Sequence, residues 1–249
     1  MNPSPAMTVE KMVATPILLF AIETVIVAIA STLQAATGMG MALLAAPLLA
    51  LVDPTLVPGP TLAAVMALST IVAWRERAAI DRHVLVTALA GLLIGCMAGA
   101  VLLALLVGLK LGRVFAVIIL GGVLLSVSGM RVRASRFALL IGGLGSGILG
   151  TMAGVHGPPI ALVLQHEPPD RLRATLCAFF AVGCLISIFA LAVTGVFGIA
   201  QIKLGIRLLP GVAIGVIFAS VIGRRIDRQR ARIAVLVVSA LSALALLLH

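Results

Sequence analysis

Charged residues are scarce in this chain of 249 residues. Asp, Glu, Lys and Arg together make up 10% of it, whereas hydrophobic residues make up 62% and the mean hydropathy is +1.26. A soluble domain needs more polar surface than this to cover its core. Apolar stretches long enough to cross a bilayer fill almost the whole length, and no hydrophilic run is long enough for a separate domain. The sequence therefore predicts one all-α polytopic membrane domain.

The residue types that build catalytic, metal or disulfide sites are also few. The cysteines, Cys96, Cys177 and Cys184, lie inside apolar stretches without metal-ligand spacing, which favours buried thiols. Tyrosine is absent, and the only tryptophan, Trp74, sits beside Arg75 at the end of a predicted span, as an interfacial anchor does. No Ser-His-Asp set, metal-spaced His/Cys group or phosphate loop falls where a pocket would form. We expect no enzymatic activity, no cofactor and no metal.

Basic residues outnumber acidic residues by 18 to 8, which gives a net charge of +10. They are dispersed among the connections between apolar stretches and form no extended basic face, so nucleic acid is not an expected partner. Membrane topology accounts for them better, because the cytoplasmic loops of membrane proteins are enriched in Lys and Arg. The expected partners are the lipid bilayer and a small anionic substrate.

The apolar stretches predict where the membrane segments lie. We expect them at 17–36, 40–52, 57–74, 84–108, 114–130, 137–164, 174–195, 206–222 and 233–248. Glycine and proline break this pattern twice, in comparable places. The first break is Thr37-Gly38-Met39-Gly40, with Pro47 following, and the second runs from Gly147 through Gly150 and Gly154 to His156-Gly157-Pro158-Pro159.

A broken helix inside lipid exposes backbone N–H and C=O groups, each of which costs several kcal/mol if it is unpaired. Such a break survives only where protein or a water-filled cavity covers it. A matched pair of interrupted spans is therefore the best pointer in a sequence to the substrate site of a transporter. The short helices after the breaks would begin near the middle of the bilayer, and helix N-termini suit an anion because they carry partial positive charge and N–H donors.

The residues in and beside the two breaks are the candidates for substrate binding. They are Gln34, Thr37, Gly38, Gly40, Pro47, Gly150, Gly154, His156, Gly157, Pro158 and Pro159. Packing is the alternative for any single glycine, but the pair of clusters favours a site. Packing is also what we expect of three glycines in the first half (Gly91, Gly95, Gly99) and two in the second (Gly211, Gly215), which recur at four-residue spacing.

Two titratable residues are candidates for proton coupling. Glu23 is the only acidic residue well inside an apolar stretch, where a charge costs roughly 2.5–3.5 kcal/mol on insertion scales. The alternative is a protonated carboxyl group hydrogen-bonded between helices. His156, within the second break, can exchange a proton near neutral pH, but a lone histidine is more often a structural hydrogen-bond partner.

The distribution of basic residues favours broken segments that return to their starting side. One face then collects Arg75, Arg77, Arg82, Arg131, Arg133, Arg136, Arg171, Arg173, Arg224, Arg225, Arg228, Arg230 and Arg232, and the other collects Lys11, Lys110, Arg113, Lys203 and Arg207. If both segments crossed once, the two faces would share these residues equally. The positive-inside rule therefore selects the returning arrangement for the second segment. For the first segment, which Lys11 alone does not settle, the resemblance between the two halves favours the same arrangement, and the arginine-rich connections are then cytoplasmic with both termini outside.

Each half of the chain would then hold an odd number of crossings. The halves, about 14–130 and 137–248, would be inverted repeats within a fold of about eight transmembrane segments, and each half would contain one broken, returning segment. This is a common plan of transporters.

The two breaks also carry a family resemblance. Thr37-Gly-Met-Gly-Met-Ala-Leu-Leu-Ala-Ala-Pro47 and Gly147-Ile-Leu-Gly-Thr-Met-Ala-Gly-Val-His-Gly-Pro-Pro-Ile160 resemble the sulfite exporter TauE/SafE family of membrane permeases. The resemblance implies a secondary transporter of the bacterial inner membrane that moves sulfite, sulfonates or related small sulfur-containing anions, usually outward. The family positions that carry over are Gly38, Gly40, Pro47, Gly150, Gly154, Gly157, Pro158 and Pro159.

The chain departs from the family at the first break, where many relatives carry a denser glycine run and this chain has Met39 and Met41.

The sequence also allows functions other than that of a carrier. The alternatives are an anion channel, a membrane-embedded enzyme and a scaffold. An enzyme would need several polar side chains at membrane depth, whereas the sequence offers chiefly Glu23 and His156. A scaffold would be expected to present a large polar surface or tail, and the connections in this chain are short.

Overall fold

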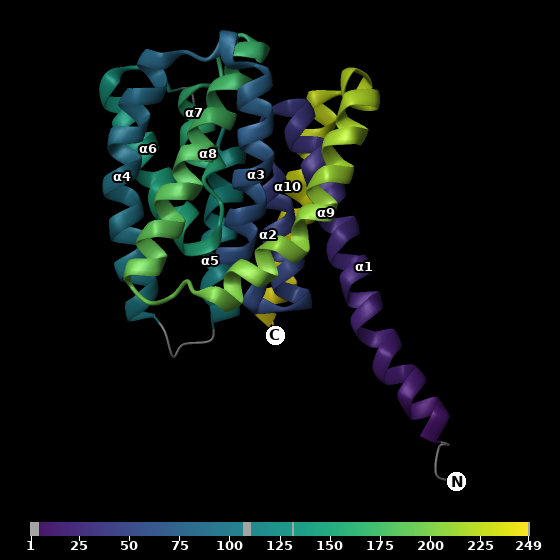
Figure 1. Cartoon of the computed structure of the whole chain (residues 1–249). Coiled ribbons are helices and arrows are strands. Elements are labelled where there is room, and N and C mark those ends of the chain that lie inside the picture. Colours follow the sequence, from purple (N-terminus) through teal and green to yellow (C-terminus); the bar gives the residue numbers. More distant parts are fainter. Residues whose placement is uncertain (1–4, 107–110, 131, 249) are drawn as a thin grey trace.

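The computed structural model describes residues 5–106, 111–130 and 132–248, and these form helices joined by short connections without any strand (Figure 1). The helices are α1 (Pro5–Thr37), α2 (Met41–Val52), α3 (Gly59–Arg75), α4 (Arg82–Leu105), α5 (Leu111–Val127), α6 (Arg136–Ala153), α7 (Gly157–Val163), α8 (Pro169–Val193), α9 (Ile199–Ile222) and α10 (Arg228–Leu248). Short 3₁₀ turns follow α2, α3 and α9, at Pro54–Leu56 (η1), Arg77–Ala79 (η2) and Gly223–Arg225 (η3). Lys110 and Arg131, which entered the topology prediction, lie outside the described residues, as do the side chains of Lys11 and Arg224.

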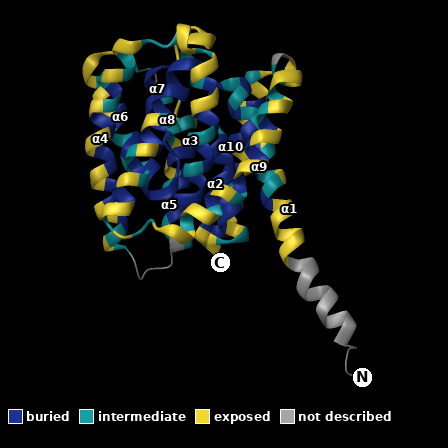
Figure 2. Ribbon diagram, in the orientation of Figure 1, coloured by how far each residue is buried: buried dark blue, intermediate teal, exposed yellow. Residues whose placement is uncertain are grey.

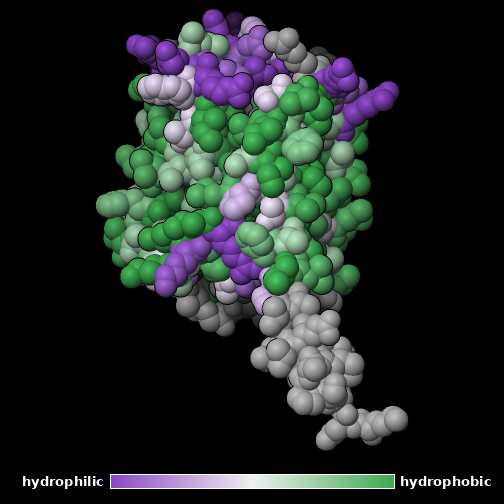
Figure 3. Space-filling model, turned by 45° about the vertical axis from the view of Figure 1, so that its right-hand side comes forward, coloured by the Kyte–Doolittle hydropathy of each residue, from purple (hydrophilic) through white to green (hydrophobic). Residues whose placement is uncertain are grey.

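The helices have the length and composition of membrane spans. Six are long and apolar enough to cross a bilayer, namely α1 from Pro16 onward, α4, α6, α8, α9 and α10, and two shorter apolar helices are α2 and the 112–127 part of α5. Large hydrophobic side chains stay exposed along the outer helices (Figure 2). On the face drawn in Figure 3, hydrophobic side chains cover most of the surface below a hydrophilic upper end. The expected all-α architecture is confirmed, while the count of eight spans stays a prediction.

Both predicted breaks are present. Gly38 and Gly40 separate α1 from α2 with φ angles of 92° and 114°, and Gly154 ends α6 with a φ of 78°. These left-handed conformations favour glycine because it has no Cβ. After each break the chain reverses. The first broken pair, α1–α2, begins and ends at the lower end of the molecule in Figure 1, and the second pair, α6–α7, begins and ends at the upper end.

The helices pack in matching pairs. α1 packs against α9 as α6 packs against α4, and α3 with α8 and α5 with α10 form two further pairs. A Cβ added at Gly91 or Gly95 of α4 would overlap the carbonyl oxygens of Leu140 and Leu144 in α6. The small residues therefore let the helix backbones touch, which confirms the packing interpretation of this glycine series.

The second pair of glycines acts in the same way between α9 and α1. A Cβ at Gly211 or Gly215 would overlap backbone of α1 at Thr24 and Ala28. Thr32 Oγ1, on α1, lies 2.7 Å from the Ala28 carbonyl and 3.3 Å from the carbonyl of Gly215 on α9. The glycines of α9 are thus also packing residues, as expected.

Ion pairs tie the halves together at the upper end. Arg173, near the start of α8, donates to Glu76 at the end of α3 (2.7 Å) and to the Ala36 carbonyl in the last turn of α1 (3.3 Å). Arg171 lies 3.5 Å from Asp81, whose carboxylate also caps α4 by accepting from the N–H groups of residues 83 and 84. The end of α1, and with it the first break, is therefore held by a side chain from the second half.

Candidate functional site

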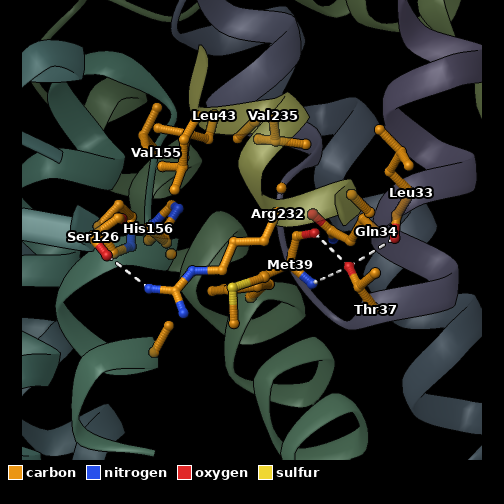
Figure 4. A pocket seen from close by; sticks show the side chains of 18 of the residues that line it. Leu33, Gln34, Thr37, Met39, Leu43, Ser126, Val155, His156, Arg232 and Val235 are labelled. Carbon is orange, nitrogen blue, oxygen red and sulfur yellow. Dashed lines mark hydrogen bonds between the residues drawn. The ribbon is translucent and has the colours of Figure 1, made fainter. Parts of the chain in front are cut away.

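A cavity of about 210 Å³ lies between the two breaks, although they are far apart in the sequence (Figure 4). Its wall is built mainly from the end of α1 and start of α2, from the α6–α7 connection and α7, and from the first turns of α10, and α3, α5 and α8 add one or two residues each. The wall includes Gln34, Thr37, Met39, Gly40, Ala42, Leu43, Ser126, Gly154, Val155, His156, Gly157, Pro158, Gln165, Phe180, Arg228, Arg232 and Val235.

Some of the predicted binding residues line this cavity and others do not. Those in the wall are Gln34, Thr37, Gly40, Gly154, His156, Gly157 and Pro158. Outside the wall, Gly38 packs against the backbone of Arg173, Gly150 lies under the ring of His156, Pro159 packs on Gly145, and Pro47 is buried within α2. The structure thus brings the two breaks together at one cavity, and assigns these last four residues to the packing around it.

Gln34 connects the first break to α3. Its side-chain oxygen accepts a hydrogen bond from the Met41 N–H (3.1 Å), and its amide nitrogen donates to Ser69 Oγ (3.0 Å). Because α2 begins at Met41, Gln34 satisfies one of the N–H groups that a helix start leaves without a partner. The amide expected to face a ligand is therefore engaged in fixing the helix start.

Backbone donors also remain at the start of α2. The first intrahelical bond of this helix runs from the Leu44 N–H to the Gly40 carbonyl (3.0 Å). Between them, the N–H groups of Ala42 and Leu43 have no acceptor among the residues that the structure describes, and both residues line the cavity. These N–H groups lie at the positive end of the α2 dipole.

The second break offers fewer donors than expected. Pro158 and Pro159 have no N–H, and the N–H of Ile160 donates to Ser146 Oγ on α6 (3.2 Å). Gly157 is then the one residue in the first turn of α7 whose N–H is left for a ligand, within the part of the chain that the structure describes. The prolines that mark the break in the sequence also remove the donors that the break was expected to supply.

His156 is held from behind by a buried polar cluster. Its Nε2 lies 3.1 Å from Ser187 Oγ, which also lies 2.7 Å from Thr151 Oγ1 and 3.2 Å from Cys96 Sγ. A hydroxyl has one proton and two lone pairs, so these three partners use its full capacity. The ring is therefore fixed by side chains from α4, α6 and α8 while it contributes to the cavity wall. Proton exchange at His156 stays a prediction.

The family model described as "Sulfite exporter TauE/SafE" matches residues 12–246, a range that contains both breaks and the whole cavity. The chain belongs to the sulfite exporter TauE/SafE family. It is accordingly a multi-pass membrane protein of a transporter family. No match was found among curated proteins or among solved structures.

In this TauE/SafE protein Glu23 lies outside the cavity wall, between α1 and α9. Its carboxylate oxygens lie 2.9 Å from Arg207 Nε and 3.0 Å from Arg207 Nη2, and its side chain is 4% exposed. The Arg207 guanidinium also lies 5.7 Å from the centre of the Phe20 ring. A carboxylate buried beside an arginine is an ion pair whose partners each offset the cost of burying the other. The coupling role of Glu23 stays a prediction, and the geometry adds a structural role.

Sequence reasoning missed the polar residues on the α10 side of the TauE/SafE cavity. Arg228 and Arg232 line the wall, and Arg232 Nη2 donates to the carbonyl of Ser126 (2.6 Å). From the sequence, both arginines were expected to act only through membrane topology. A signal was present, because residues 228, 232, 235 and 236 share one face of a helix and the last two are apolar.

Proposed function

We propose that this TauE/SafE protein is a secondary transporter that moves a small anion across the bacterial inner membrane, and that the anion is sulfite, a sulfonate or a related oxidised sulfur compound. One observation carries the proposal: the two broken segments meet at a single cavity whose described wall contains two arginines, a histidine and unpaired backbone N–H groups, and no carboxylate. Such a wall attracts negative charge and repels none of it. Family membership supports the sulfur chemistry.

In this proposal the anion binds to the ends of the broken helices. Its oxygens accept hydrogen bonds from the N–H groups of Gly157, Ala42 and Leu43, which all belong to residues in the cavity wall. Gly40 and Gly154 contribute by adopting the positive φ angles that turn the backbone at each break. The packing residues Gly38, Pro47, Gly150 and Pro159 act indirectly, by fixing the positions of these turns.

The proposed orientation places the arginine-rich upper end in the cytoplasm, as the positive-inside rule favours. Residues 14–130 and 137–248 are then inverted repeats, and the matching helix pairs α1–α9 and α6–α4 support this arrangement. The exposed wall residues Gln165 and Arg232 support a cavity mouth toward this arginine-rich end. Transport proceeds by alternating access, in which the repeats rearrange to open the same site to the other side.

The decisive experiment blocks the cavity without disturbing the fold. Gly157 lines the cavity, and a Cβ added there would meet only the ring edge of Phe180, at 3.8 Å. Gly157→Val therefore projects methyl groups toward the substrate. The matched control is Gly121→Val, because Gly121 lies on the exposed face of α5 with nothing within 4 Å of an added Cβ.

Both variants are reconstituted into vesicles, and the flux of radiolabelled sulfite is measured. We expect Gly157→Val to lower the flux at least about tenfold and Gly121→Val to leave it unchanged, with both proteins unfolding at the wild-type temperature. Wild-type flux from a correctly folded Gly157→Val protein would show that the anion does not pass this site. Saturation at low sulfite, and acceleration by sulfite on the opposite side, distinguish a carrier from a channel.

A further inference from the structure

The cavity contains positive charge that the described protein does not neutralise. Six of the described carboxylates are paired with arginines elsewhere: Glu23 with Arg207, Glu76 and Asp170 with Arg173, Asp81 and Glu167 with Arg171, and Asp227 with Arg230. Asp53 instead accepts from the backbone and side chain of Thr55. None of these residues lines the cavity.

Arg232 is positioned to present this charge to a ligand. It lies in the second turn of α10, and its side chain extends toward Ser126, as Figure 4 shows. The Ser126 carbonyl belongs to the last turn of α5, where a helix carries partial negative charge and favours a cation. This contact at 2.6 Å involves one of the five N–H donors of the guanidinium. Arg232 makes no ion pair among the described residues.

The backbone donors alone do not select for charge. Two of the expected N–H groups of α7 are removed by proline, a third is taken by Ser146, and one in α2 is taken by Gln34. The N–H groups that remain, among them those of Gly157, Ala42 and Leu43, are dipoles, which also bind neutral oxygen acceptors. A full charge is needed to discriminate a monoanion from a neutral molecule of the same shape.

We propose that Arg232 is the charge-selecting residue of the cavity, and that its guanidinium binds two oxygens of an oxyanion whose remaining oxygen faces the backbone N–H groups. The proposal rests on the proposed transport function. A planar guanidinium matches two oxygens of a sulfite or sulfonate group in the way it matches a carboxylate, and a lysine ammonium reproduces the charge without this geometry. The ligand class is therefore an oxyanion with at least two oxygens at one end, and a halide binds poorly.

The test uses two ligands of similar shape and different charge. Methanesulfonate and dimethyl sulfone each carry a sulfur with oxygens and one or two methyl groups, but only methanesulfonate is an anion. Each competes with radiolabelled sulfite for the full-length protein in detergent. Wild type is expected to prefer methanesulfonate strongly. Arg232→Gln lowers the affinity for sulfite at least about tenfold, since a hydrogen bond to a charged group is lost, and removes most of the preference between the two competitors.

The matched control is Arg230→Gln, two residues along the same helix. The Arg230 side chain is 89% exposed, pairs with Asp227 at 3.3 Å and lies outside the cavity wall, so its loss removes one positive charge from the same end of the protein. It is expected to leave affinity and preference unchanged. Arg232→Lys is expected to keep the preference for the anion and to bind sulfite more weakly than wild type does.

The outcomes separate this inference from the proposed function. A folded Arg232→Gln protein that binds sulfite with wild-type affinity and still prefers methanesulfonate overturns the role of Arg232 and leaves the transport function standing. Equal loss in Arg230→Gln also overturns it, because the effect then comes from general surface charge. If Arg232→Gln does not fold, Arg232→Lys decides, since unchanged affinity for sulfite would exclude the two-oxygen geometry. A wild-type protein that neither binds nor carries any of these anions overturns the transport function and the inference together.

Discussion

At the scale of single residues, the pairing of Glu23 with Arg207 decides how this carboxylate is understood. Both groups lie between α1 and α9, away from the cavity, with the carboxylate almost fully buried. Arg207 keeps 35% of its side chain exposed. The pair therefore fastens α1 to α9.

Substitution separates the structural role from proton coupling. Glu23→Gln removes the negative charge and leaves Arg207 without its partner, which is expected to lower the free energy of unfolding by about 1–3 kcal/mol. The double variant Glu23→Gln, Arg207→Gln is expected to be more stable than the single variant. Thermal unfolding in detergent measures both effects. Unchanged stability, together with sulfite flux that no longer responds to a pH gradient, would instead assign Glu23 to coupling.

At the scale of elements, the two glycines of the connection between α1 and α2 differ in how closely they are packed. Gly38 and Gly40 both have positive φ angles, but a Cβ at Gly38 would lie 2.7 Å from the Cα of Arg173, whereas at Gly40 it would meet only Val235 at 3.5 Å. Gly38 is therefore constrained by a neighbour in the second half of the chain, whereas Gly40 is constrained mainly by its own backbone conformation.

Alanine substitutions at these positions are expected to rank in that order. Gly40→Ala carries the strain of a left-handed residue, which costs of order 1–3 kcal/mol. Gly38→Ala carries the same strain and must also push away the backbone of α8, so its unfolding temperature falls further. The comparison is made by thermal unfolding of both proteins under one set of conditions. Equal or reversed effects would show that α8 yields easily at this contact.

At the scale of the whole molecule, the connections between helices gather at two opposite ends, which gives the proposed orientation a direct test. The connections at η2 and η3 lie at one end, and the α8–α9 connection lies at the other (Figure 1). The three cysteines are buried, so a single added cysteine is the main target for a thiol reagent that cannot cross membranes.

Labelling of intact cells tests the proposed orientation. Arg77→Cys in η2 is expected to react only after the membrane is permeabilised, whereas Ala200→Cys at the start of α9 is expected to react in intact cells. Unmodified protein serves as the control for the native cysteines. The opposite pattern would invert the molecule and place the cavity mouth outside.

The sequence alone determined the features that depend on local chemistry. The positions of the apolar helices followed from apolar length, although α8, α9 and α10 begin five to seven residues before the predicted starts at 174, 206 and 233. The turns followed from glycine and proline, and the close helix contacts from small residues four positions apart such as Gly91 and Gly95. The family was also readable at this stage, because its motifs are the breaks themselves. These features need no knowledge of which helices are neighbours.

Only the tertiary structure decided which side chains and backbone groups contact one another. The capacity of each break to donate hydrogen bonds depended on Gln34 and Ser146, which consume N–H groups that a sequence counts as available. Glu23 pairs with Arg207 because α1 packs against α9, and Arg232 lines the cavity because α10 packs beside both α2 and α5. Side chains meet across helices far apart in the chain, and that meeting is set by packing, which no local pattern encodes.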